Sequence, residues 1–123
     1  MAFIADRVLD NGLSALSAEA TRLDICSSEP TSYTEATSTV TLGNKTGVSV
    51  GTPTARSPDG RKVTVASISD GSVSGTGTAS HWALTDPTNS RLLATGSLSA
   101  SQAVTSGNTF TLAAFDIGIP GAV

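Results

Sequence analysis

The residues that could carry out chemistry in this chain of 123 residues are few and far apart. His81 is the only histidine and Cys26 is the only cysteine. A cysteine nucleophile needs a general base beside it, and a zinc site needs several imidazole or thiolate ligands. Because neither residue has a suitable partner nearby in the sequence, we expect His81 to be a structural hydrogen-bonding residue and Cys26 to be a small residue on a strand.

The sequence also lacks the other familiar catalytic and ligand-binding patterns. It contains no glycine-rich dinucleotide or phosphate motif, and its carboxylates are dispersed without the Asp-x-Asp spacing of a calcium loop. We therefore predict that the chain is not an enzyme and has no catalytic, cofactor-binding or metal-binding residues.

The composition favours strands over helices. Only 14% of the residues are charged, against about 25% in an average protein, and the chain contains 18 serines and 18 threonines. Threonine and valine suit pleated, half-buried surfaces. A net charge of -3 is too small to indicate disorder. The sequence therefore predicts a single mainly β domain over residues 1–123.

The charge and hydropathy patterns exclude two classes of partner. The seven Lys and Arg residues are scattered, so we expect no nucleic acid. No apolar run approaches the ~18–20 residues needed to span a bilayer, so we expect no membrane. The first ten residues lack the features of a secretory leader, and the single Cys26 excludes an internal disulfide. We expect synthesis in a reducing host cytoplasm.

The one helical pattern lies near the N-terminus and predicts an α-helix over residues 3–18. Its apolar positions recur on one helical face: Ala5, Val8, Leu9, Gly12, Leu13 and Leu16. Two alternatives stay open, because such a helix can cap one end of a sheet or pack on a neighbouring subunit.

Residues 60–119 are predicted to form the main β core, because apolar residues alternate along short segments that frequent turn residues separate. Asp86-Pro87-Thr88-Asn89 has the chemistry of a turn between two strands, and residues 98–104 are expected to be a connection. The pattern predicts an antiparallel β-sandwich or jelly-roll-like domain with one N-terminal α-helix. The expected core side chains are Trp82, Leu84, Phe110, Leu112, Val63 and Val65.

Residues 28–59 differ in composition from the rest of the chain. Three prolines and several glycines and serines interrupt this segment, which we expect to be an extended arm or ordered loops. Residues 37–42 and 48–52 could pair with each other inside it. An arm of this length can gain order by lying on a neighbouring chain.

Three segments carry a resemblance to a family of proteins: TRLDICSSEPTSYTEATS, SPDGRKVTV and DPTNSRLLATGSLSASQAVTSGNTFTLAAFDIGIP. There the chain resembles small virion structural proteins of tailed bacteriophages, most closely the capsid decoration (cement) proteins. Decoration proteins of this size are commonly β-sandwiches that sit as trimers on the shell. The resemblance implies a virion protein on the capsid surface, with itself and the major capsid protein or other virion proteins as partners.

Two classes of function remain in competition. The first is a virion structural protein, either a capsid decoration protein or a neck, tail or fibre component. The second is a monomeric β-sandwich that binds a ligand such as a glycan. For the first class, we expect a homo-oligomer, in particular a homotrimer. The expected assembly contacts are apolar or aromatic residues of the ends and the arm: Phe3, Ile4, Val8, Tyr33, Val48, Ile117 and Ile119.

Overall fold

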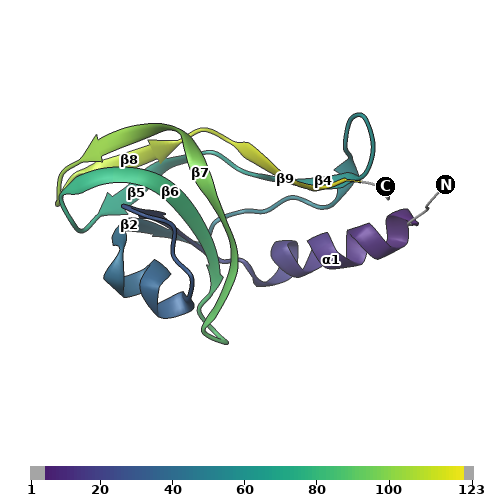
Figure 1. Cartoon of the computed structure of the whole chain (residues 1–123), viewed down its shortest axis with the longest axis horizontal. Coiled ribbons are helices and arrows are strands. Elements are labelled where there is room, and N and C mark those ends of the chain that lie inside the picture. The colour runs from purple at the N-terminus through teal and green to yellow at the C-terminus, as the bar shows by residue number, and fades with distance from the viewer. Residues whose placement is uncertain (1–4, 121–123) are drawn as a thin grey trace.

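The computed structural model describes residues 5–120, apart from the side chain of Asp6, and contains two antiparallel sheets and one N-terminal α-helix (Figure 1). The larger sheet has six strands in the order β7-β6-β1-β2-β5-β8, and the smaller sheet has three in the order β3-β4-β9. In chain order the elements are α1 (Asp6–Glu19), β1 (Arg22–Cys26), the π-helical η1 (Glu35–Thr39), β2 (Thr41–Thr46), β3 (Thr54–Ala55), β4 (Arg61–Val65), β5 (Ile68–Val73), β6 (Gly77–Asp86), β7 (Arg91–Val104), β8 (Thr109–Leu112) and β9 (Phe115–Ile119).

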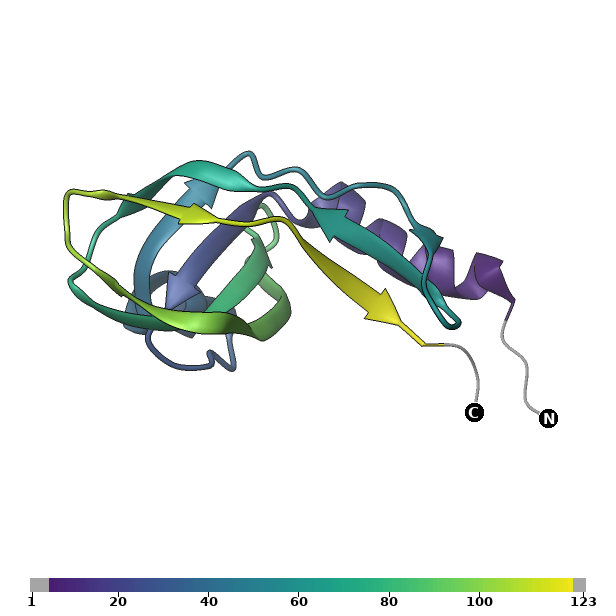
Figure 2. The same ribbon diagram turned by 90° about the horizontal axis from the view of Figure 1, so that it is seen from above.

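The prediction of a mainly β fold with one N-terminal α-helix is confirmed, but the sheets are not clearly those of a jelly-roll sandwich. The six-stranded sheet curls into a half-barrel, and the small sheet extends away from it beside α1 (Figure 2). The reason is a shared ribbon. β4 pairs with β9 and β5 pairs with β8, so one long two-stranded ribbon bends and contributes a pair of strands to each sheet. The second sheet therefore continues the first instead of covering it.

Helix α1 begins at Asp6 and ends at Glu19, close to the predicted span of 3–18. Its apolar face buries Leu9 and Leu13 and packs against β4. Arg61 of β4 donates to Asp10 across this contact, with a distance of 2.7 Å between Nε and Oδ1. Burial of this face and the ion pair together fix the helix on the small sheet, so α1 packs on its own chain.

Residues 28–59, expected to be an extended arm or ordered loops, do contain loops, but they do not form an arm separate from the sheet. The central part of this segment forms η1 and then β2, which lies inside the large sheet between β1 and β5. The expected pairing of residues 37–42 with 48–52 does not form, because β2 pairs with β1 and β5 instead. Leu42 and Val48 pack on the main core of their own chain. Apolar alternation alone could not show which sheet these residues join.

Strand β1 is covered on both faces. Leu23 and Ile25 face the main core, while Cys26 packs on Ala36 of η1 on the other side. Asp24 is fully buried on that second side, where Arg22 donates to its carboxylate at 2.7 and 3.0 Å and Thr41 donates at 2.6 Å. The three donors compensate the buried charge, so η1 can cover a strand that carries an aspartate.

The structure buries four of the six expected core side chains, Val63, Val65, Leu84 and Phe110, whereas Trp82 and Leu112 are half-buried at the margin of the main core. Val63 lies in the small sheet, on the strand against which α1 packs. The apolar core thus extends through both parts of the molecule.

Two glycines lie under aromatic rings in the large sheet. Gly96 is opposite Trp82 in the ladder between β6 and β7, and Gly71 is opposite Phe110 in the ladder between β5 and β8. A Cβ atom would lie 2.6 Å from the indole at Gly96 and 2.3 Å from the phenyl ring at Gly71. Each ring therefore rests on bare backbone, an arrangement that glycine alone allows.

Candidate functional site

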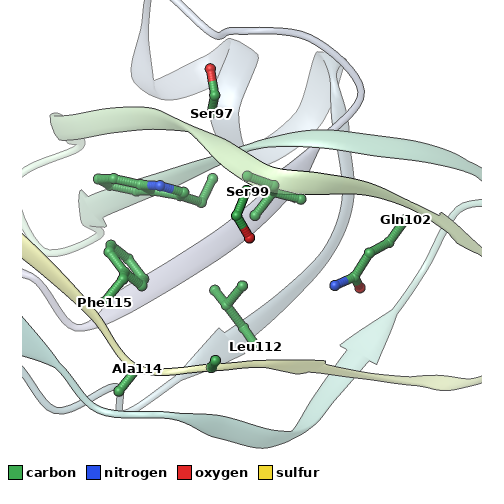
Figure 3. Close-up of a pocket in the computed structure, with 9 residues that line it drawn as sticks. Ser97, Ser99, Gln102, Leu112, Ala114 and Phe115 are labelled. Carbon is green, nitrogen blue, oxygen red and sulfur yellow. The ribbon is translucent and has the colours of Figure 1, made fainter.

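The two ends of the curled sheet enclose the most distinctive surface feature of the molecule, a cleft of about 450 Å³ (Figure 3). Within the described residues, β7 pairs only with β6 and β8 pairs only with β5, so these strands are the edges of the half-barrel. The cleft lies between β7 and the junction of β8 with β9. Its lining consists of Trp82, Ser97, Leu98, Ser99, Gln102, Leu112, Ala113, Ala114 and Phe115.

A large bulge in β7 forms one wall of the cleft. Gln102 pairs with Ala79 and Ser97 pairs with His81, so the four residues 98–101 lie opposite Ser80 alone. Bulges of this kind bend a strand and re-aim its side chains. In Figure 3 the hydroxyl of Ser99 and the amide of Gln102 point into the cleft, while Ser97 lies at the margin with its hydroxyl directed away.

The opposite wall is formed where one strand ends and the next begins. β8 ends at Leu112 and β9 begins at Phe115, and Ala113 and Ala114 between them have no ladder partner among the described residues. Their small side chains leave space in front of the backbone. Both walls of the cleft therefore contain backbone that is outside the regular sheet ladders.

An aromatic pair closes one end of the cleft. The rings of Trp82 and Phe115 lie 4.6 Å apart between centroids and are tilted by 41°. Gly96 lies against the indole and Phe115 packs on it, so this ring is partly covered by its own chain. This end of the cleft supplies an apolar wall.

The cleft is electrically neutral, because none of its lining residues is charged. Among the described residues, six Lys and Arg side chains form ion pairs elsewhere, with carboxylates of the same chain. The pairs are Arg22–Asp24, Lys45–Asp70, Arg56–Asp59, Arg61–Asp10, Lys62–Asp116 and Arg91–Glu19. A neutral cleft selects for an uncharged occupant, since a charged group would lose its hydration there without gaining a partner.

The two residues first considered for chemistry lie outside the cleft lining. His81 has the Ser80 hydroxyl 2.8 Å from Nδ1 and the Ser97 hydroxyl 3.5 Å from Nε2. Neither of these partners is a carboxylate, so His81 lacks the acidic partner that orients the histidine of a catalytic triad. Burial and the nearby Asp24 carboxylate raise the pKa of the Cys26 thiol to about 12, so this thiol stays protonated and is a poor nucleophile.

A second polar cluster lies beneath η1 and is built for packing. A hydrogen bond to the Asp24 carboxylate is the main cause that raises the pKa of Arg22. The hydroxyl of Thr85 is buried and has no hydrogen-bond partner. The guanidinium and the carboxylate satisfy each other, so this cluster presents no unpaired charge to a ligand.

The predicted assembly residues are spread over the molecule and do not form one patch. Val8 is 62% exposed on α1, Ile117 and Ile119 are half-buried on β9, Tyr33 is half-buried before η1, and Val48 packs on its own core. Phe3 and Ile4 lie outside the described residues.

The sequence prediction missed the cleft itself, because residues 98–104 were expected to be a connection. The run SLSASQA at residues 97–103 is the one available signal, since its small polar residues break the apolar alternation.

Residues 5–120 contain no group of three or more His, Cys, Asp and Glu residues that could hold a metal ion. No helix in this range is long and apolar enough to cross a membrane. Comparisons with protein-family models, curated proteins and solved structures find no significant match to this chain.

Proposed function

We propose that this chain is a structural protein of a tailed-phage virion, and that it decorates and stabilises the capsid as an oligomer. Its chemistry is that of protein–protein binding. The observation that carries the proposal is the neutral cleft between two strand edges. Such a site can bind polypeptide, and its lining has no charged group that would bind a charged substrate. The resemblance in sequence to decoration proteins supports the virion as the place where this binding occurs.

The edge strand β7 carries only one charged residue, Arg91 at its start, and this composition supports an assembly role. Edge strands of monomeric proteins are commonly protected by charged residues or proline, which prevent pairing with other chains. Residues 92–104 contain neither. An edge of this composition is suited to burial in an assembly, although its bulge prevents a long uninterrupted ladder.

We propose a non-catalytic role for the reactive residues. His81 is engaged with two serine hydroxyls, and the raised pKa of Cys26 keeps its thiol protonated. These contacts suit residues that hold the sheet together. The same role needs no cofactor or metal.

In the proposed oligomer, which we take to be a trimer, the outer face of α1 supplies a contact between copies. Val8 is the large apolar side chain that this face exposes. The half-barrel and its extension can serve this purpose whether or not they are classified as a sandwich.

Depletion and rebinding test the proposal. Particles stripped of this protein are mixed with purified protein, and bound copies are counted by imaging. Saturable rebinding in symmetry-related clusters on the shell is the expected result. A few copies at one vertex would place the protein in the neck, tail or fibre instead. Failure to rebind, together with binding to a glycan array, would favour the ligand-binding alternative.

A further inference from the structure

We propose that the cleft between the β7 bulge and the β8–β9 junction binds a short, extended, uncharged peptide segment of a different protein chain. The segment lies across the open side of the half-barrel and places apolar side chains against the aromatic end. The source of the segment rests on the proposed function, in which it belongs to a neighbouring protein of the particle.

The backbone of the two walls is the first argument for a peptide. Residues 98–101 on one wall and 113–114 on the other are outside the regular ladders of the described sheets. Backbone N–H and C=O groups that are to be covered need hydrogen-bond partners. An extended segment offers such groups on both of its edges, as in other cases of strand addition. The bulge limits the contact to a short segment, because a long ladder would need regular spacing.

The side chains that point into the cleft are the second argument. The amide of Gln102 is both a donor and an acceptor, which is the hydrogen-bonding complement of a peptide group. The hydroxyl of Ser99 can act either way on the same side (Figure 3). Leu98, Leu112 and Phe115 line the remaining surface and suit apolar side chains. The mixture fits a polypeptide with apolar residues better than it fits a purely apolar ligand.

The neutral lining disfavours the exposed turns of a second copy as occupants of the cleft. The loop at residues 56–60 carries Arg56 and Asp59, and the turn between β6 and β7 is bounded by Asp86 and Arg91. Either loop would bring a charge into a cleft that has no group to pair with it. The turn at residues 105–108 is uncharged but tight, with Gly107 at a φ of 92°, and it is not an extended segment.

The experiment uses the single tryptophan as a reporter of occupancy. Trp82 is the only tryptophan and lines the cleft, so a bound segment changes its fluorescence. A displayed library of short linear peptides is selected on the full-length protein, and the most enriched sequence is synthesised and titrated. Enrichment of uncharged peptides with apolar residues at alternate positions, together with a saturable change in Trp82 emission, is the expected result.

Matched variants show whether the binding occurs in the cleft. Ala114→Glu places a carboxylate in the lining, and Ala55→Glu places one at an exposed position of β3 in the small sheet, outside the cleft. Ala114→Glu should weaken peptide binding roughly tenfold or more, since the bound strand would desolvate the new charge, whereas Ala55→Glu should change the affinity by less than about twofold. Circular dichroism and urea denaturation of each variant show whether its fold is retained. Should Ala114→Glu fail to fold, Ser99→Lys replaces it.

Several outcomes would overturn the inference. The first is enrichment of charged peptides. The second is a selection on wild type that enriches no more peptides than the same selection on Ala114→Glu. The third is equal affinity of the synthesised peptide for Ala114→Glu and for wild type. Self-association in sedimentation that Ala114→Glu abolishes would assign the cleft to a second copy. Rebinding of wild type and Ala114→Glu to depleted particles with equal affinity would leave the proposed function standing and remove the cleft from it. Peptide binding in the cleft without rebinding to particles would support the cleft as a peptide site and contradict the proposed function.

Discussion

At the residue scale, Gly71 and Gly96 allow two aromatic rings to pack directly on the backbone of the large sheet. Each glycine lies directly across the ladder from a ring that occupies the space of its missing side chain. The rings can therefore approach the backbone and cover the ladder hydrogen bonds. Both pairs lie near the edges of the sheet, where the half-barrel curls toward the cleft.

Replacing either glycine with alanine should destabilise the protein by about 1–3 kcal/mol, because the new Cβ overlaps the ring and the sheet must shift. Urea denaturation followed by circular dichroism measures the free energy of unfolding. Gly51→Ala is the matched control, since the nearest atom to its Cβ is the Thr64 carbonyl oxygen at 3.5 Å. The assignment fails if Gly71→Ala and Gly96→Ala are as mild as this control.

Cys26 should make the stability depend on alkaline pH. Its pKa rises from an ordinary value near 9.0 to about 12 in the folded protein. Above pH 9 the folded state therefore keeps the thiol proton while the unfolded state releases it. The contribution of Cys26 to the free energy of unfolding is therefore fully present below pH 9 and is lost as the pH rises toward 12. Between pH 8 and pH 10 the wild type should lose about 1.4 kcal/mol more than Cys26→Ala does. Equal slopes of unfolding free energy against pH in the two proteins would contradict this expectation.

The sequence predicted single residues well where their role is local. The Asp86 turn forms as expected, with the Asp86 carboxylate accepting from the Thr88 N–H at 3.1 Å and from Asn89 Nδ2 at 2.8 Å. These partners lie within three residues, so local chemistry determines them. The bulge at residues 98–101 depends instead on the register with β6, which no local pattern of small polar residues reveals.

At the element scale, the strand expected at Cys26 is confirmed as β1, but its central place in the large sheet was not predicted. Leu23 and Ile25 alternate with Asp24 and Cys26, which is typical of a strand with one wet face. In the structure η1 covers that second face, because Arg22 and Thr41 neutralise and bond the buried aspartate. The covering element comes from the segment that we expected to be an arm, and its destination depends on long-range packing.

Substitutions on the two faces of helix α1 should have different effects on stability. Leu13→Ala should cost about 2–5 kcal/mol of unfolding free energy, because Leu13 is only 1% exposed where the helix packs on the sheet. Val8→Ala on the same helix should change the stability by less than about 0.5 kcal/mol, since Val8 is largely exposed. Chemical denaturation measures both, and sedimentation then shows whether Val8→Ala weakens the proposed oligomer. A large loss of monomer stability in Val8→Ala would contradict the observed orientation of the helix.

At the scale of the whole molecule, the bent ribbon joins the half-barrel to the part formed by α1 and the small sheet. Val65 pairs with Phe115 on one side of the bend, and Ile68 pairs with Leu112 on the other. Phe115 packs on Trp82 of the half-barrel just where the ribbon leaves it. This ring contact therefore helps to hold the two parts in their relative orientation.

Phe115→Ala should shift the emission of Trp82 to longer wavelength in the folded protein, because the indole loses its ring neighbour and gains water. The loss of stability should be about 1–3 kcal/mol, below the ~3–5 kcal/mol of a fully buried ring, since Phe115 is half-buried. Phe110→Ala is the contrasting variant. It should cost more, because Phe110 is only 3% exposed, and leave the emission of folded Trp82 unchanged. Identical spectra of Phe115→Ala and wild type would refute the coupling.

The bend also explains why the sandwich was predicted. Residues 61–73 and 109–119 alternate as strands of ordinary spacing, and nothing in their composition marks a break at which one ribbon passes from one sheet to another. The N-terminal helix and turns such as residues 86–89 follow from local sequence patterns. The arrangement of the sheets follows from contacts between residues far apart in the chain.

The N-terminal end of α1 and the C-terminal end of β9 lie at the same pole of the elongated molecule, and the half-barrel lies at the other (Figure 2). Additions made at the start of α1 or at the end of β9 would therefore begin on the side away from the half-barrel. The proximity of these ends also permits a circular permutant, in which a short linker joins them and new ends are made in the exposed turn at residues 105–108. In such a protein the new ends would lie at the edge of the half-barrel, so the same scaffold could present a cargo from either pole.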